Sequence, residues 1–195
     1  MTHVAICIPS GEMVHAEFAL SLAAIVGSTR VAKISLWNQR SAVLPESRNR
    51  LVRDALKAKA THLLWLDSDM VVPPFALDRL LAHREPIVGA TYAKRAPPHE
   101  IVGRAPLDQS DVPAGLTAMH YMGFGCVLID ASVFVAVPGP WFDLDLRAEP
   151  QVHEDRWFFR EAIACGYRVL CDDWLTTQLG HIGSTVHRIE AEASA

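Results

Sequence analysis

The sequence has no run of basic residues, no Cys-x-x-Cys pair and no apolar stretch of the roughly 18 residues that a membrane span needs. The first absence weakens a nucleic-acid partner without excluding it, because non-specific affinity for nucleic acid comes mostly from neutralised phosphates. The second disfavours a zinc or disulfide framework and favours reduced cysteines. The stretch 18–27 is apolar like a signal-peptide core, but Glu12 and Glu17 precede it where a basic residue is typical. We therefore expect a cytoplasmic protein with no membrane span.

Length and composition indicate one globular domain. The chain has 195 residues, of which 50% are hydrophobic and 21% charged, and its net charge is −4. These values exclude a disordered, collagen-like or coiled-coil chain. No repeat or long linker divides the sequence. We expect a single domain over residues 1–188 and a frayed tail over residues 189–195, which are small and polar.

Short apolar runs alternate with helix-like segments along the chain. Such runs are typical of strands buried on both faces, and their alternation with helices predicts an α/β fold with a mostly parallel sheet. Two proline-containing segments, 96–116 and 138–150, are expected to be irregular. The expected strands are 4–9, 31–37, 62–66, 87–92, 123–130 and 167–171, and the expected helices are 16–27, one from Ser47, one from Pro73 and 155–165.

Asp67-Ser68-Asp69 directly follows the apolar run 62–66. In an open α/β sheet, ligands bind outside the carboxyl ends of the strands. Two carboxylates one residue apart at such an end can share a divalent cation and the phosphates that it bridges. The alternative is that the aspartates only form local turns, which aspartate favours at strand ends.

Two acidic residues and a histidine form further candidate sites. Glu154 and Asp155 open a helix, where a carboxylate either stabilises the helix N-terminus or serves as a general base. His181 stands between Gly180 and Ile182 beyond the last expected strand. A histidine in this position is either structural or closes over a bound metal ion.

Two more groups have both a structural and a functional interpretation. Arg48 and Asn49 lie at the start of a helix, where they form ordinary salt bridges or face an anion. Gly123 and Gly125 flank Phe124 at the start of an expected strand. Glycines there indicate a bulge or a close approach of the backbone to a bound sugar.

Taken in order, these motifs resemble one family over residues 4–188. The sequence resembles glycosyltransferases of the GT-A fold, similar to family 2 and its small bacterial and phage-type relatives. The resemblance implies a Rossmann-like α/β/α sandwich with a mostly parallel central sheet. The motifs that carry it are Pro9-Ser10, Ser47-Arg48-Asn49-Arg50, Asp67-Ser68-Asp69, Gly123-Phe124-Gly125, Trp141-Phe142, Glu154-Asp155 with Phe158, and Gly180-His181.

The resemblance also implies a role for each motif. Asp69 and His181, with Asp67, would ligate Mn²⁺ or Mg²⁺, and Asp155 would be the catalytic base with Glu154 beside it. Trp141 and Phe142 would offer a stacking wall for a sugar. The residues implied to bind the nucleotide sugar are Pro9, Ser10, Arg48, Asn49, Asp67, Ser68, Gly123, Phe124, Gly125 and Trp141.

These roles imply a metal-dependent enzyme that moves a sugar from a nucleotide-diphosphate sugar to an acceptor hydroxyl with inversion. The acceptor could be a glycan, a protein or modified DNA. Two other classes remain open. Aspartates at strand ends with a metal also serve a nucleotidyltransferase or phosphohydrolase, and the same fold could form a catalytically silent nucleotide-sugar-binding module.

Overall fold

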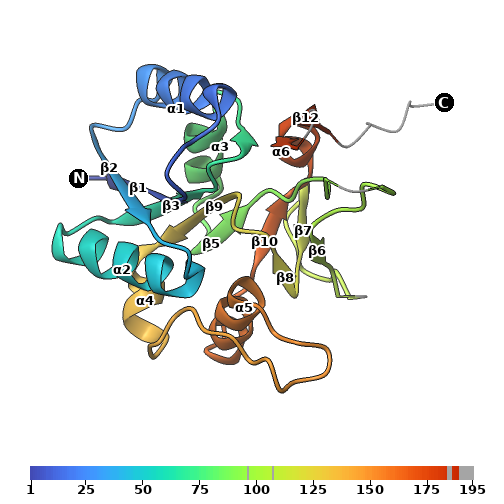
Figure 1. The fold of residues 1–195 in the computed structure, drawn as a ribbon. Coiled ribbons are helices and arrows are strands. Elements are labelled where there is room, and N and C mark those ends of the chain that lie inside the picture. The colour runs from blue at the N-terminus through green and yellow to red at the C-terminus, as the bar shows by residue number, and fades with distance from the viewer. Residues whose placement is uncertain (96, 107, 184–185, 189–195) are drawn as a thin grey trace.

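The computed structural model describes residues 1–95, 97–106, 108–183 and 186–188. Its centre is a seven-stranded sheet in the order β2-β1-β3-β9-β5-β10-β7 (Figure 1). These strands are β1 (His3–Ser10), β2 (Lys33–Arg40), β3 (His62–Leu66), β5 (Ile87–Gly89), β7 (Leu116–Ala118), β9 (Cys126–Asp130) and β10 (Leu170–Asp172). Two small sheets lie beside it: β12 (Val186–His187), β11 (Gly180–Ile182) and β4 (Met70–Val71), and the pair β6 (Gly103–Arg104) and β8 (Tyr121–Met122).

The central sheet is mostly parallel, as predicted. β1, β2, β3, β5 and β10 run in one direction, whereas β9 and β7 run against it. The antiparallel β9 lies between β3 and β5 and pairs with both. It therefore separates β1, β2 and β3 from β5 and β10.

Helices cover both faces of the sheet and make an α/β sandwich (Figure 1). Alternate residues of β1 supply the two cores: Val4 and Ile6 contribute to one hydrophobic cluster, and Ala5 and Cys7 to the other. The first cluster packs against α1 (Ala16–Ser28), α3 (Ala76–His83) and α6 (Asp173–Gln178). The second packs against α2 (Leu44–Lys57), α4 (Ala131–Ala136) and α5 (Glu154–Ala164).

Several elements begin or end away from their expected positions. The strand expected over 87–92 stops at Gly89, because the backbone N–H of Thr91 donates to Thr176 Oγ1 instead of continuing the ladder. The helix expected from Ser47 already begins at Leu44, with Pro45 in its first turn, where proline needs no N–H partner. Phe75, which directly precedes α3, is exposed and packs on Trp174.

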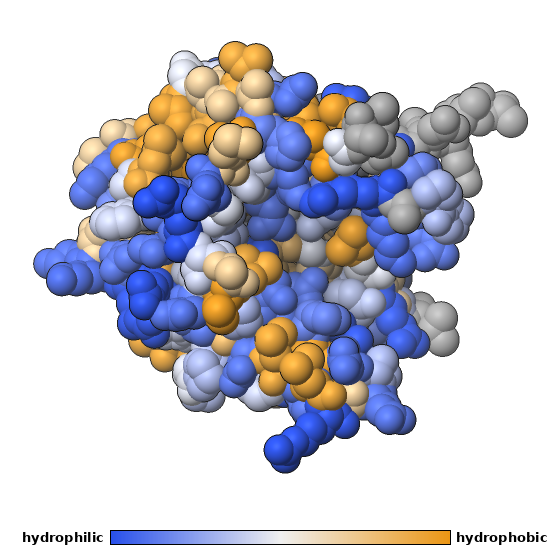
Figure 2. Space-filling model, in the orientation of Figure 1, coloured by the Kyte–Doolittle hydropathy of each residue, from blue (hydrophilic) through white to orange (hydrophobic). Residues whose placement is uncertain are grey.

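The first helix presents apolar side chains to solvent. Phe18 and Ile25 are buried, whereas Leu20 is 72% exposed and Val26 is also exposed. Figure 2 shows hydrophobic residues gathered in the upper part of this face, where Figure 1 places α1.

Among the described helices, none is both long and apolar enough to cross a membrane. The four cysteines carry free thiols, as expected from their spacing.

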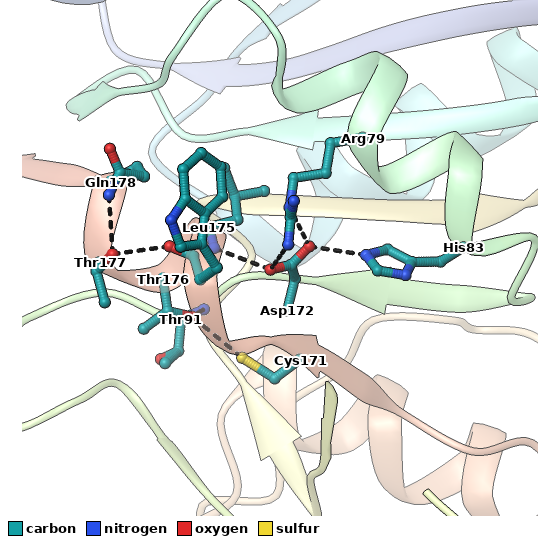
Figure 3. A network of polar contacts seen from close by, with 10 residues as sticks. Arg79, His83, Thr91, Cys171, Asp172, Leu175, Thr176, Thr177 and Gln178 are labelled. Atoms are coloured by element: carbon teal, nitrogen blue, oxygen red, sulfur yellow. Dashed lines mark hydrogen bonds and ion pairs between the residues drawn. The ribbon is translucent and has the colours of Figure 1, made fainter. Parts of the chain in front are cut away.

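A polar network ties α3 to α6 beside the carboxyl end of β10 (Figure 3). The buried Asp172 accepts hydrogen bonds from Arg79 Nε (2.6 Å) and Nη2 (2.9 Å), from His83 Nε2 (2.7 Å) and from the backbone N–H of Leu175 (2.8 Å). Burial opposes ionisation of Asp172, but these hydrogen bonds outweigh it and hold the pKa of its carboxyl below the usual value. Asp172 also caps α6.

Candidate functional site

A cavity of about 430 Å³ opens beyond the carboxyl ends of β1 and β3. It is bordered by six residues that the sequence singled out: Pro9, Ser10, Asp67, Ser68, Asp69 and His181. A larger cavity of about 1100 Å³ lies at the opposite ends of these strands, beside Thr2 and His62, and none of the predicted site residues borders it. The smaller cavity is the candidate site, because ligands of open α/β sheets bind at the carboxyl ends of the strands.

Pairing between β4 and β11 brings the early aspartates to the late histidine. In this antiparallel pair Met70 lies opposite His181, and the backbone N–H of Ile182 donates to the carbonyl of Asp69 at 2.8 Å. The side chains of Asp69 and His181 then face each other, with Oδ2 and Nε2 3.6 Å apart. Residues more than a hundred positions apart thus share one edge of the cavity.

The backbone fixes the state of the His181 ring. Its Nδ1 lies 2.8 Å from the carbonyl oxygen of Ala93, which can only accept, so Nδ1 carries the proton and Nε2 presents a lone pair. Burial lowers the pKa of His181, and the charge of Arg95 lowers it further. A neutral imidazole with Nε2 free to accept is the form that ligates a metal ion.

Arg95, which was not among the expected site residues, contacts both of these side chains. Its Nε donates to His181 Nε2 at 2.9 Å, and its Nη2 forms an ion pair with Asp69 Oδ2. The guanidinium therefore spans the two groups. Arg95 directly precedes the proline-containing segment 96–116 and carried no sequence signal beyond its charge.

Tyr92 borders the cavity and explains the two glycines. A Cβ at Gly123 would lie 2.3 Å from the Tyr92 hydroxyl, and a Cβ at Gly125 would lie 2.5 Å from the Tyr92 ring. The Tyr92 ring also meets His181 edge-on, with centroids 4.9 Å apart. The close approach suspected at these glycines is thus an approach to Tyr92, which holds His181 in place. Burial is the main reason that the pKa of Tyr92 stands well above its usual value.

Arg48 is a buried cation that connects the two acidic motifs. Its side chain is 2% exposed, with the guanidinium carbon 4.8 Å from the centre of the Phe124 ring. Nη2 donates to Asp67 Oδ1 at 2.9 Å, and Nε lies 3.6 Å from Glu154 Oε1. Nε and Nη1 have no hydrogen-bond partner among the described residues. A nucleotide contact was expected of Arg48. Its burial places it behind the cavity, where it forms an ion pair with Asp67.

Asn49 and the aromatic residues also have interior roles. The Asn49 side chain donates to the carbonyl of Phe142 (2.7 Å) and accepts from the backbone N–H groups of Trp141 (3.1 Å) and Phe142 (3.2 Å). The Trp141 indole donates to the carbonyls of Phe134 and Val137. Phe124 and Phe142 are buried and pack on each other edge-on, 5.1 Å apart. The side chains of Phe124 and Phe142 were expected to line a sugar pocket, and this expectation is wrong. Both rings are buried in the core, where Asn49 holds the backbone of Phe142 in place.

Asp155 lies in the first turn of α5, beside Glu154. His153 is the N-cap residue, and its side chain makes no capping bond, so neither carboxylate is the cap itself. Asp155 Oδ1 accepts the backbone N–H of Arg156 at 2.6 Å. Burial raises the pKa of Asp155, and the charge of Glu154 raises it further. Neither acid borders the 430 Å³ cavity. Glu154 is connected to it indirectly, because Arg48 contacts both Glu154 and Asp67, and Asp67 borders the cavity.

The donors present fit a divalent cation that also takes ligands from elsewhere. Among the described residues, no three His, Cys, Asp or Glu side chains are grouped closely enough to hold a metal ion by themselves. Asp69 and His181 offer one oxygen and one nitrogen 3.6 Å apart, and Asp67 borders the same cavity. Mn²⁺ and Mg²⁺ are commonly held by one or two protein ligands together with water and substrate phosphates.

Comparisons with known proteins establish similarity of fold alone. No family model matches the sequence, and no curated protein matches it. A solved structure described as the crystal structure of A197 from STIV is similar, with a TM-score of 0.66 and 14% sequence identity. The match covers 100% of this chain and 97% of that chain. The two chains therefore share their architecture over nearly their whole lengths.

Proposed function

We propose that the chain is a metal-dependent glycosyltransferase of the GT-A type, similar to family 2, acting on a nucleotide-diphosphate sugar. One observation carries the proposal: the carboxylate of Asp69 lies 3.6 Å from the neutral Nε2 of His181 in the cavity beyond β1 and β3. This pair of donors suits a cation that bridges phosphates. Pro9 and Ser10 border the same cavity, at the end where a nucleotide base would lie.

The donor would bind along this cavity. Pro9 and Ser10 would contact the base, and Asp67 and Ser68 would face the ribose and the diphosphate. Asp69 and His181 would hold Mn²⁺ or Mg²⁺. When bound, the cation supplies Lewis-acid stabilisation of the negative charge on the departing diphosphate. Arg48 would keep Asp67 in position from behind, because its guanidinium is fixed among aromatic rings and bonded to that carboxylate.

Asp155 is the proposed base, and Glu154 supports it. An acceptor hydroxyl would lose its proton to Asp155 as its oxygen bonds to the anomeric carbon, while the bond from that carbon to the diphosphate breaks on the opposite face. Inversion follows from this geometry. The raised pKa of Asp155 brings it closer to neutral pH, which favours proton transfer in both directions. The acceptor class is a glycan, a protein or modified DNA.

A product analysis tests the proposal against its alternatives. The protein is incubated with UDP- and GDP-sugars, Mn²⁺ and a panel of hydroxyl acceptors, and the products are identified by mass spectrometry. Transfer gives a nucleoside diphosphate and a new glycoside. A phosphohydrolase would instead release a nucleoside monophosphate and a sugar phosphate, and a silent module would raise the melting temperature without any product.

Matched variants assign the product to the site. Asp69→Asn should abolish transfer, because it weakens one ligand of the cation. Asp108→Asn is the control, since Asp108 is an exposed turn residue that does not border the cavity. Equal transfer by both variants would contradict the role of Asp69. Formation of monophosphate by the parent would replace the proposal with phosphoryl chemistry.

A further inference from the structure

We propose that Arg95 is an internal competitor for the divalent cation: its guanidinium holds Asp69 and His181 until a cation arrives together with a nucleotide diphosphate, and it then pairs with that diphosphate. This inference rests on the proposed function. It adds a residue that couples cation binding to donor binding.

The competition follows from the atoms that Arg95 uses. Its Nη2 pairs with Asp69 Oδ2, and its Nε donates to His181 Nε2 at 2.9 Å. These are the same oxygen and nitrogen that would ligate the cation. His181 Nε2 has a single lone pair, so it accepts from Arg95 or binds a metal ion but cannot do both. Repulsion between the guanidinium and a cation at this point also prevents both from being present.

The Arg95 side chain can leave without disturbing the core. It is 52% exposed, and its long aliphatic stem lets the guanidinium swing while the backbone stays in place. The same segment keeps His181 oriented, because the carbonyl of Ala93 holds Nδ1 whether or not Arg95 is bound to Nε2. The imidazole therefore stays ready for the cation when Arg95 departs.

The displaced guanidinium can pair with a diphosphate bound in the same cavity. Arg95 borders it together with Asp67 and Ser68, where the diphosphate of the donor is expected. A guanidinium can form two parallel hydrogen bonds to phosphate oxygens (bidentate binding), whereas an ammonium cannot. A cation alone must displace Arg95 without compensation, whereas a cation with a diphosphate gives Arg95 a new partner. Mn²⁺ and the nucleotide diphosphate should therefore bind with positive coupling, and that coupling is reciprocal.

Arg95→Gln tests the competition directly, with Lys94→Gln as the matched control. Lys94 is the neighbouring cation, but it pairs with the exposed Glu100 and does not border the cavity. Binding of Mn²⁺ alone is followed by loss of the free Mn²⁺ signal in electron paramagnetic resonance. Because an exposed ion pair and one hydrogen bond no longer oppose the cation, Arg95→Gln should bind Mn²⁺ roughly 5- to 30-fold more tightly than the parent. Lys94→Gln should match the parent.

A second titration measures the coupling. UDP and GDP are titrated by calorimetry with and without Mn²⁺. In the parent, Mn²⁺ should tighten the diphosphate and the diphosphate should tighten Mn²⁺ by the same factor. In Arg95→Gln that factor should fall by roughly tenfold, since the variant has neither the competitor to displace nor the guanidinium to offer.

The outcomes separate this inference from the proposed function. If Arg95→Gln and the parent bind Mn²⁺ equally tightly, the competition is overturned, while the cation site and the proposed function stand. If neither binds Mn²⁺, with or without UDP or GDP, the cation site itself is refuted and the inference falls with it. Product analysis of the parent then decides independently whether transfer occurs without a cation.

Discussion

Replacing Arg48 with methionine tests whether a buried cation holds the two acidic motifs together. Arg48→Met keeps a long apolar side chain among the rings of Trp65, Phe124 and Phe142 but removes the charge. Asp67 and Glu154 then lose their shared partner. Their carboxylates stay close to the core, since the side chain of Asp67 is 24% exposed and that of Glu154 is 12% exposed.

The expected loss of stability follows from opposing contributions. Breaking a buried ion pair by removing one partner costs about 3–5 kcal/mol. Two effects reduce this value here. Asp67 is partly hydrated, and the variant removes two buried nitrogen atoms of Arg48, Nε and Nη1, that have no hydrogen-bond partner among the described residues, so the loss should fall at or below the lower end of that range. We therefore expect a net loss of about 2–3 kcal/mol, or roughly 4–12 °C in melting temperature for a chain of this length.

Thermal and urea denaturation of three variants measure this loss. Arg50→Met is the control, because Arg50 lies on the same helix but is exposed and pairs with the exposed Glu46 one turn away. It should change the free energy of unfolding by about 0.5 kcal/mol or less. The double variant Arg48→Met/Glu154→Gln should recover part of the loss, since it also removes one of the two carboxylate charges that have lost their partner. If Arg48→Met is as stable as Arg50→Met, the ion pairs do not stabilise the site and the reasoning fails.

Three further predictions concern other parts of the structure. Gly125→Ala should destabilise the protein by about 1–3 kcal/mol, because its Cβ would meet Tyr92 at 2.5 Å, whereas Gly27→Ala at an open position should be neutral or stabilising; equal melting temperatures would contradict the packing. Asp155→Asn should lower turnover roughly 10²-fold or more and leave the melting temperature at neutral pH equal or higher, because a raised native pKa means that the ionised form costs stability above the unfolded pKa; full turnover at saturating donor and acceptor would rule out the base role. Asp172→Asn should be less stable than the parent at neutral pH, and the gap should close as pH falls through the lowered pKa of Asp172; a gap that does not depend on pH, followed by melting curves, would show that ionisation of Asp172 contributes nothing.

The strands that frame the site could be predicted because they are buried on both faces. The run 62–66 is continuous and apolar and ends at Asp67, and the structure gives β3 the same bounds. An apolar run does not encode direction, however. The sequence therefore did not show that β9 runs antiparallel between β3 and β5. The short strands β4 and β11 were also missed, since two or three residues carry no periodicity.

The polar residues of the site were harder to assign than the strands. His181 was found through its flanking glycine, but its orientation depends on the carbonyl of Ala93, which no side-chain pattern reveals. Arg48 looked like an exposed charge in a first helical turn, and only the tertiary packing of three aromatic rings buries it. Gly123 and Gly125 signalled a close approach without saying to what. Arg95 carried no signal beyond its charge.

Calorimetric titration of UDP and GDP, with and without Mn²⁺, into the parent and Asp69→Ala tests the central claim most directly. Asp69 lies at the edge of the cavity, so truncation should leave the fold intact. Asp108→Ala is the control for loss of an exposed carboxylate. The proposed cation site predicts Mn²⁺-dependent binding of at least one diphosphate to the parent and to Asp108→Ala, and at least a tenfold loss of that affinity in Asp69→Ala. Unchanged Mn²⁺-dependent binding in Asp69→Ala, or no binding by the parent under any condition, would contradict it.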